Sequence, residues 1–181
     1  SIDESLLQAA IYNHHKLDLH LFHSEKVNEE NAAELLKEMD GILIAPGFGQ
    51  RGIEGKFAAI KYARENNVPC LGICLGMQCM VIEFARDVLG YKDANSTEME
   101  PNTTHKVIDM MEEQKNITNL GGTMRLGAYD CDLRKGSKVY EAYGEEHIQE
   151  RHRHRFEFNN EYKEQFEAAG MKCTGINPET N

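Results

Sequence analysis

The sequence predicts an α/β fold, with an open, mostly parallel sheet and helices on both faces in a flavodoxin-like three-layer arrangement. Two continuously apolar runs, residues 41–45 and 68–73, are typical of strands buried on both faces. A segment of helical spacing separates them, which indicates a βαβ unit with a right-handed crossover. Both strands should therefore end at the same edge of the sheet.

Length and composition fit one domain spanning residues 1–181. Of the 181 residues, 40% are hydrophobic and 28% are charged, as in ordinary globular proteins. A formal net charge of -10 disfavours nucleic acid and anionic membrane surfaces as partners. No apolar run approaches the roughly 20 residues of a membrane span, and the start lacks a secretion-signal pattern, so we expect a cytoplasmic protein.

The first elements follow from residue spacing. Apolar residues recur at helical intervals over residues 3–13 and then alternate with other residues over 17–21, which predicts a helix followed by a strand. Asn28 can cap a second helix that runs to about Met39. The strand at 41–45 comes next.

The next elements surround two glycine-rich segments. A loop over residues 46–55 holds four glycines and precedes a helix over 56–66. After the strand at 68–73, a helix runs from Cys74 to about Val88 and stops near Gly90.

The last part of the chain is less regular. We expect a strand over residues 107–111, a strand pair over 124–133 and an alternating strand over 150–158. Asn159 or Asn160 can cap a final helix that ends at Gly170.

Cys74 is the candidate nucleophile. It lies between Gly72 and Gly76 where an apolar strand gives way to a helix, the pattern of a nucleophile elbow. The N–H groups of the first helical turn favour a thiolate and can hold an oxyanion. The alternative is a buried core cysteine, which is the interpretation that we adopt for the other four cysteines: Cys70, Cys79, Cys131 and Cys173.

The loop Ala45-Pro46-Gly47-Phe48-Gly49 should lie beside Cys74. Both follow strands that end at the same sheet edge, where open α/β sheets bind ligands. Gly47 lacks a Cβ and can bring its N–H close to the site, beside the N–H of Leu75. A plain turn is the alternative.

The run Arg151-His152-Arg153-His154-Arg155 alternates with period two. Its three arginines suit a carboxylate, and a salt-bridged strand surface is equally compatible with Arg151 and Arg153. The two histidines could chelate a metal. No third ligand of suitable spacing accompanies them, so we expect packed, hydrogen-bonded histidines.

Four stretches together resemble the glutaminase domain of the CTP synthases, which belong to the class I glutamine amidotransferases. They lie at residues 41–55, 72–98, 121–127 and 150–159 and include Gly-Ile-Cys-Leu-Gly-Met-Gln, Asn-Ser-Thr-Glu and the Arg-His run. The resemblance implies that Cys74 attacks the side-chain amide of L-glutamine, that ammonia leaves, and that a γ-glutamyl thioester is hydrolysed. The ammonia then aminates UTP to CTP in a separate ATP-dependent domain.

The resemblance also implies a role for each motif residue. Cys74 is the nucleophile, and the N–H groups of Gly47 and Leu75 support the oxyanion. Glu98 pairs with the α-ammonium of glutamine and Arg155 with its α-carboxylate. The glutamine-binding set comprises Gly47, Leu75, Gly76, Met77, Gln78, Glu98 and Arg155.

Partners and cofactors follow from the same resemblance. No metal and no cofactor are expected in this domain, whereas ATP and Mg²⁺ act in the synthetase domain of the parent chain. The implied partners are L-glutamine and that synthetase domain, in a homo-oligomer.

The sequence departs from the family pattern because it lacks the motif of the family's catalytic base. The family's histidine and its orienting acid occur as His-Pro-Glu, and none of the eight histidines here precedes a proline. The family's first strand and its C-terminal His-x-Glu segment have no counterpart either. We therefore expect a fragment that alone neither makes CTP nor turns glutamine over at a useful rate.

Three alternatives remain. Another class I amidotransferase would share the cysteine motif but serve a different acceptor. A non-catalytic interaction domain would keep the fold without the chemistry, and a metal-binding protein would use His152 and His154.

Overall fold

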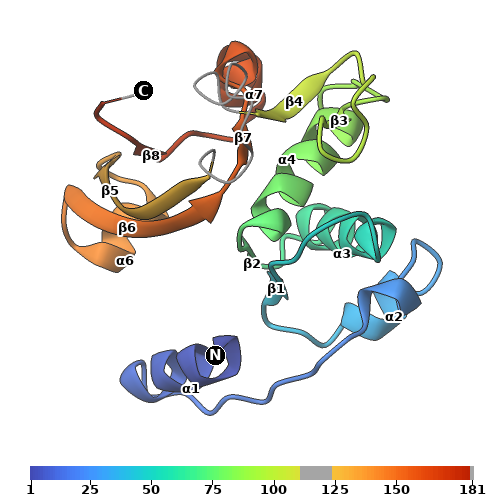
Figure 1. The fold of residues 1–181 in the computed structure, drawn as a ribbon. Coiled ribbons are helices and arrows are strands. Elements are labelled where there is room, and N and C mark those ends of the chain that lie inside the picture. The colour runs from blue at the N-terminus through green and yellow to red at the C-terminus, as the bar shows by residue number, and fades with distance from the viewer. Residues whose placement is uncertain (111–123, 180–181) are drawn as a thin grey trace.

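The computed structural model describes residues 1–110 and 124–179 (Figure 1). The expected strand at 107–111 and the motif at 121–127 fall partly outside the described residues. In chain order the elements are α1 (Ile2–Tyr12), η1 (Ser24–Lys26), α2 (Ala32–Leu36), β1 (Ile42–Ile44), α3 (Ile53–Glu65), β2 (Cys70–Gly72), α4 (Leu75–Asp87), β3 (Asn95–Ser96), β4 (Lys106–Met110), β5 (Arg125–Leu133), α6 (Lys138–Tyr143), β6 (His147–His154), β7 (Phe156–Phe158), η3 (Asn160–Tyr162), α7 (Lys163–Ala169) and β8 (Gly175–Ile176).

The α/β class is confirmed, and the strands that carry the glycine loop and Cys74 are parallel as predicted. β1 pairs with β2, with Ile44 opposite Gly72. The remaining ladders of the described residues are mixed, because β3 pairs with β4 in parallel whereas β4–β7, β5–β6 and β5–β8 are antiparallel. The described strands form three small sheets, so the expectation of one mostly parallel sheet holds for the site-bearing pair and for β3–β4.

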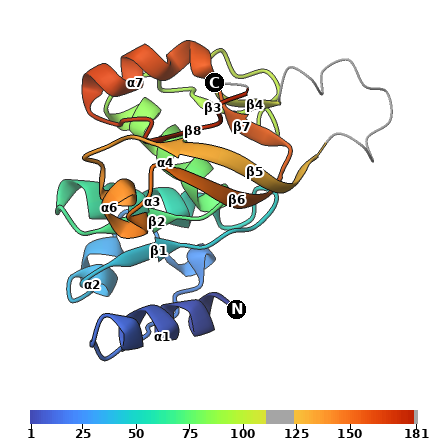
Figure 2. The same ribbon diagram turned by 90° about the vertical axis from the view of Figure 1, so that its left-hand side faces the viewer.

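The main core lies where α3 and α4 pack against each other and against β1, β2 and β4. Ile82 of α4 and Val107 and Ile108 of β4 are fully buried. The ring of Phe166 in α7 lies 5.5 Å from that of Phe84 and closes the core from the other side. Figure 2 shows β5 and β6 side by side as a long twisted ribbon.

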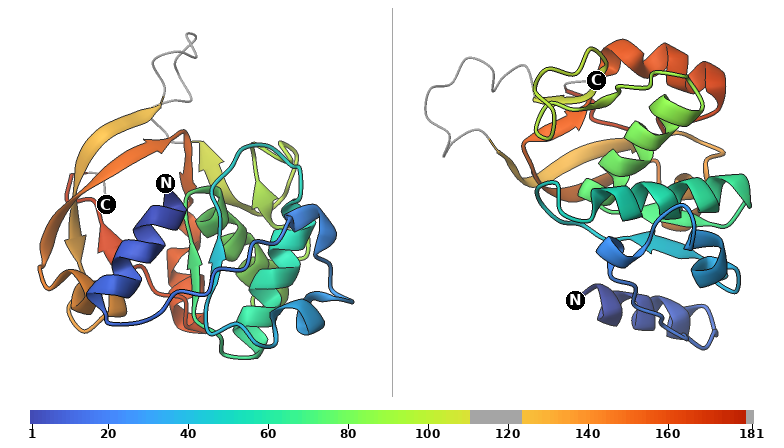
Figure 3. Two further views of the ribbon diagram at one scale, coloured as in Figure 1. Left: turned by 90° about the horizontal axis from the view of Figure 1, so that it is seen from below. Right: turned by 90° about the vertical axis from the view of Figure 1, so that its right-hand side faces the viewer.

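The N-terminal region differs from the sequence expectations. α1 forms as predicted, but every one of its residues is at least partly exposed, and it lies apart from α3 and α4 in all views (Figure 3). Residues 17–21 join no ladder within the described chain and form no strand. Alternating residues favour a strand, but a strand also requires a hydrogen-bonded neighbour.

Two further corrections concern the second half of the chain. Residues 125–133 form the single strand β5 and not a strand pair, since its antiparallel partner is β6. α6 was not expected from the sequence. Ser137 caps it by accepting a hydrogen bond from the N–H of Tyr140, and Gly144 ends it with a φ of 72°.

Within the described residues no helix is both long and apolar enough to cross a bilayer.

Candidate functional site

Cys74 lies at a strained bend between β2 and α4. Its φ of 54° and ψ of -110° lie outside the regions that L-residues favour, and it is the N-cap residue of α4. Such a conformation costs on the order of 1–3 kcal/mol and persists only where the surroundings enforce it. The strand-to-helix bend predicted from Gly72-Ile73-Cys74-Leu75-Gly76 is therefore confirmed.

The two flanking glycines enforce this bend. A Cβ on Gly76 would lie 2.1 Å from the carbonyl oxygen of Ile44, because the first turn of α4 packs directly on β1. A Cβ on Gly72 would lie 2.6 Å from the backbone of Gly76 and of Met77. Only glycine allows strand and helix to approach this closely.

The glycine loop and Cys74 are neighbours, as the parallel strand pair predicts. The N–H of Ile73 donates to the carbonyl of Ile44 at 3.1 Å and extends the register of β1 and β2 to the bend. A Cβ on Gly47 would lie 3.4 Å from Cδ2 of Leu75. Gly47, Cys74 and Leu75 line one pocket. Leu75 is the first residue of α4, so its N–H has no acceptor one turn earlier in the helix.

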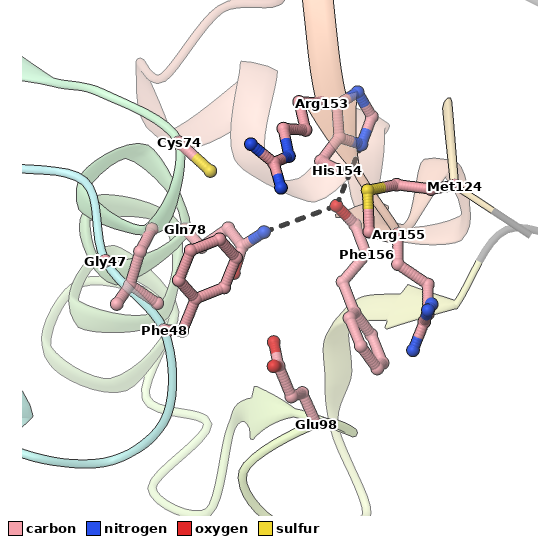
Figure 4. A pocket seen from close by; sticks show the side chains of 11 residues that line it. Gly47, Phe48, Cys74, Gln78, Glu98, Met124, Arg153, His154, Arg155 and Phe156 are labelled. Atoms are coloured by element: carbon pink, nitrogen blue, oxygen red, sulfur yellow. Dashed lines mark hydrogen bonds between the residues drawn. The ribbon is translucent and has the colours of Figure 1, made fainter. Parts of the chain in front are cut away.

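The opposite walls of this pocket come from α4, from the loop after β3, and from the junction of β6 and β7. Gln78 is 5% exposed, and its Nε2 donates to the carbonyl of Phe156 at 3.2 Å. Glu98 is exposed and directs its carboxylate into the hollow below Gln78, whereas Cys74 lies at its upper side (Figure 4). Arg155 lines the pocket on the far side from Cys74.

The sequence predicted no place in the pocket for four of the lining residues: Phe48, Met124, His154 and Phe156. Arg153 was expected only as one of three arginines that suit a carboxylate or form a salt-bridged surface. Strict alternation would place Arg153 and His154 on opposite faces of one strand. In the structure the strand is interrupted at Arg155: β6, before it, pairs with β5, and β7, after it, pairs with β4. Consecutive side chains can then face the same hollow, and the guanidinium of Arg153 extends toward Cys74 (Figure 4).

Two residues of the expected glutamine-binding set do not line the pocket. Gly76 is buried against β1, and the side chain of Met77 is 39% exposed on another face of α4. Cys74, Gly47, Leu75, Gln78, Glu98 and Arg155 all line it.

The other cysteines lie in surroundings that disfavour the thiolate. Burial raises the pKa of Cys70 and of Cys79 to about 11. It also raises the pKa of Cys131 and of Cys173. Cys79 is a core residue as expected, whereas the other three are half-buried.

His152 and His154 are packed and hydrogen-bonded, as predicted. Nδ1 of His152 lies 2.8 Å from Nε2 of His154, and Nδ1 of His154 lies 3.2 Å from the carbonyl of Phe156. Burial, followed by the charge of the neighbouring His152 and of Arg125, lowers the pKa of His154. Within the described residues, no three His, Cys, Asp or Glu side chains are grouped to hold a metal.

This lowered pKa predicts a pH dependence of stability. Below the ordinary histidine pKa of about 6.5, His154 is protonated in the unfolded chain but stays neutral in the folded one. The free energy of unfolding therefore falls as the pH drops through that pKa. Between pH 7.5 and 5.5, we expect the melting temperature of the His154→Gln variant to fall less than that of the wild type.

A control of opposite sign is His147, whose pKa is raised by its hydrogen bond to Asp132. Its contribution to stability is present in acid and is lost as the pH rises, so His147→Gln should lose more melting temperature on acidification than the wild type. Equal pH slopes in all three proteins would contradict the assignment.

Comparisons with known proteins agree with this geometry. The family described as "Glutamine amidotransferase class-I" matches residues 1–181. A CTP synthase of Porphyromonas gingivalis is 71% identical over 180 residues, which are 99% of this chain and 33% of that protein. A CTP synthase of Bacteroides thetaiotaomicron is 68% identical over 181 residues, 100% of this chain and 34% of that protein. The chain thus spans about one third of the length of these curated relatives.

A solved structure supports the same relationship. The glutaminase domain of Trypanosoma brucei CTPS with bound acivicin superposes with a TM-score of 0.89 at 37% sequence identity, covering 97% of this chain and 69% of that one. The family profile covers the whole chain, and the solved glutaminase domain superposes on almost all of it. The chain therefore belongs to the class I glutamine amidotransferase family.

Proposed function

We propose that this chain is the glutaminase part of a CTP synthase and that Cys74 is its nucleophile. The observation that carries the proposal is the strained bend at Cys74, which opens on a pocket shared with Gly47, an acidic side chain and guanidinium groups. A strained backbone and two glycines that tolerate no Cβ are hard to explain as features of a packed core cysteine.

The reaction begins with attack of the Cys74 thiolate on the amide carbon of the glutamine side chain. The S–C bond forms and the π electrons of the carbonyl move to oxygen, where the N–H groups of Gly47 and Leu75 stabilise the negative charge. The oxyanion electrons then re-form the carbonyl as the C–N bond breaks, and the departing nitrogen takes a proton from water and leaves as ammonia. The resulting γ-glutamyl thioester is hydrolysed by water, which gives glutamate and frees the Cys74 thiol.

Recognition of glutamine requires one group for each of its backbone charges. Glu98 offers a carboxylate to the α-ammonium, and Arg155 offers a guanidinium to the α-carboxylate. Arg153 lines the same pocket and is a second candidate for the carboxylate.

The fate of ammonia follows from the relatives. Proteins called CTP synthase that are three times as long match this chain along its whole length. In such a parent, ammonia would pass to a synthetase domain that uses ATP and Mg²⁺ to convert UTP to CTP, in a cytoplasmic homo-oligomer.

The isolated chain should acylate but not turn over. His154 is the histidine that lines the pocket, and its ring nitrogens face His152 and the Phe156 carbonyl. Among the pocket residues described above, no free histidine can therefore protonate the leaving amine as a general acid and then deprotonate the hydrolytic water as a general base.

The γ-(4-nitrophenyl) ester of L-glutamate tests this proposal, because nitrophenolate leaves without a proton. We expect one equivalent of nitrophenolate per chain, followed by a much slower phase, and a γ-glutamyl adduct on Cys74 by mass spectrometry. Glu98→Gln should require roughly 10- to 100-fold more ester for half-maximal burst rate, since it removes a charge-assisted hydrogen bond.

Two results would contradict the proposal. A burst that is equal for the D-ester would argue against specific recognition, and steady ammonia release from glutamine by the isolated chain would refute single turnover. A non-catalytic interaction domain would give no burst, and another class I amidotransferase would show the burst while its full-length parent makes no CTP.

A further inference from the structure

The proposed chemistry needs the glycine loop, residues 46–55, to be held in a defined position. Gly49 and Gly52 adopt positive φ values of 73° and 71°, and a Cβ on Gly49 would meet nothing within 4 Å. Pro46 has no N–H, so Gly47 is the first residue after β1 and Ala45 that can supply a donor to the pocket. Side-chain contacts with the rest of the chain can fix the position of that N–H.

Lys56 contacts the start of this loop. It belongs to the first turns of α3, where a cation is disfavoured by the helix dipole, yet its side chain is half-buried. Its Nζ donates to the carbonyl of Ala45 at 2.5 Å and lies 3.9 Å from the position of a Cβ on Gly47. The ammonium therefore lies beside Gly47 and binds the carbonyl of the peptide that precedes the one with the proposed oxyanion donor.

Gln50, in the middle of the loop, contacts the segment that carries Glu98. Its Nε2 donates to the carbonyl of Met99, which is 8% exposed. Met99 follows Glu98 in the chain, so this hydrogen bond joins the glycine loop to the segment that carries the proposed partner of the α-ammonium.

We propose, on the basis of the proposed function, that Lys56 and Gln50 are positioning residues that fix the glycine loop at its start and at its middle. Lys56 sets the orientation of the peptide at Gly47, and Gln50 sets the distance between the loop and the Glu98 segment. Neither side chain lines the pocket, so both act through the backbone that they hold.

The two roles lead to separable effects. Loss of the Lys56 contact displaces an oxyanion donor, which slows attack on a carbonyl but not alkylation by iodoacetamide, since alkylation at a methylene carbon develops no oxyanion. Loss of the Gln50 contact alters the spacing of the pocket walls, which raises the ester concentration needed for half-maximal burst rate.

The test compares nitrophenolate burst kinetics with iodoacetamide alkylation of Cys74 in the 181-residue chain, using the Cys74→Ser chain as the blank for spontaneous ester breakdown. For Lys56→Met we expect a burst rate lower by roughly 10- to 100-fold, less than the loss of a whole oxyanion donor, and an alkylation rate within about twofold. Lys56→Arg keeps a donor on a long stem and should restore most of the burst rate.

The matched controls lie outside the loop. Lys61 is on the same helix and pairs with Glu29 at 3.0 Å, so Lys61→Met should leave both reactions unchanged. Gln50→Leu should raise the half-saturating ester concentration about tenfold with little change in the maximal burst rate, whereas Gln149→Leu, on an exposed strand position bonded to Asp130, should change neither.

Three results would overturn the inference. These are that Lys56→Met slows neither reaction, that it slows both equally, or that Lys56→Arg fails to recover the burst rate. A wild-type chain that alkylates at Cys74 but gives no burst would instead overturn the proposed function, and this inference with it.

Discussion

Replacement of Cys74 by alanine should abolish the nitrophenolate burst and the γ-glutamyl adduct, leaving only spontaneous ester breakdown. The expected loss is complete because the proposed reaction forms its bond to this sulfur, and Cys74 is the one cysteine among the described residues that line the pocket. Thermal unfolding should change little, since the Cys74 side chain is half-exposed and contributes little packing.

Cysteine mapping provides the companion measurement. The pKa of about 11 at Cys70 and at Cys79 leaves very little thiolate near neutral pH, so iodoacetamide should modify both on the order of 100-fold more slowly than an ordinary thiol. Cys74 should therefore be modified well before them, and prior reaction with the L-glutamate ester should protect it. Equal modification of Cys74 and Cys79, with no protection, would favour a non-catalytic domain.

Substitution of Gly76 by alanine should destabilise the chain by about 3 kcal/mol, which lowers the melting temperature by roughly 6–12 °C. The added Cβ would lie 2.1 Å from the Ile44 oxygen and 2.8 Å from the Ile44 carbonyl carbon, both of them backbone atoms of β1. The start of α4 must then move away from the strand, and the bend at Cys74 moves with it. Denaturant unfolding measures the change.

The matched control is Gly41, which lies just before the same strand. A Cβ there would approach nothing closer than the Pro69 oxygen at 3.7 Å, an ordinary contact. Gly41→Ala should change the free energy of unfolding by less than about 0.5 kcal/mol. Similar losses for both variants would show that the close approach of α4 to β1 is not what requires glycine at position 76.

Local sequence determined the part of the site that depends on backbone conformation. Glycines on either side of a cysteine, after an apolar run and before an amphipathic one, predict a sharp strand-to-helix bend, and the φ of 54° at Cys74 agrees. The adjacency of Gly47 and Cys74 was also predictable, because parallel strands joined by one crossover must end at the same edge. These features depend on neighbours in the chain and on the handedness of the connection.

Only the tertiary structure decided which surfaces face the bend. At Arg155 the strand partner changes from β5 to β4, and both Arg153 and His154 line the pocket beside this break. Residue alternation along one unbroken strand would place these two side chains on opposite faces. The hydrogen bond between Gln50 and Met99 joins residues 49 positions apart in the chain. The strand expected at residues 17–21 does not form, since this segment pairs with no strand of the described chain. The physical reason is the same in each case: spacing along the chain specifies the conformation that a segment favours, whereas strand partners and pocket walls depend on contacts between distant segments.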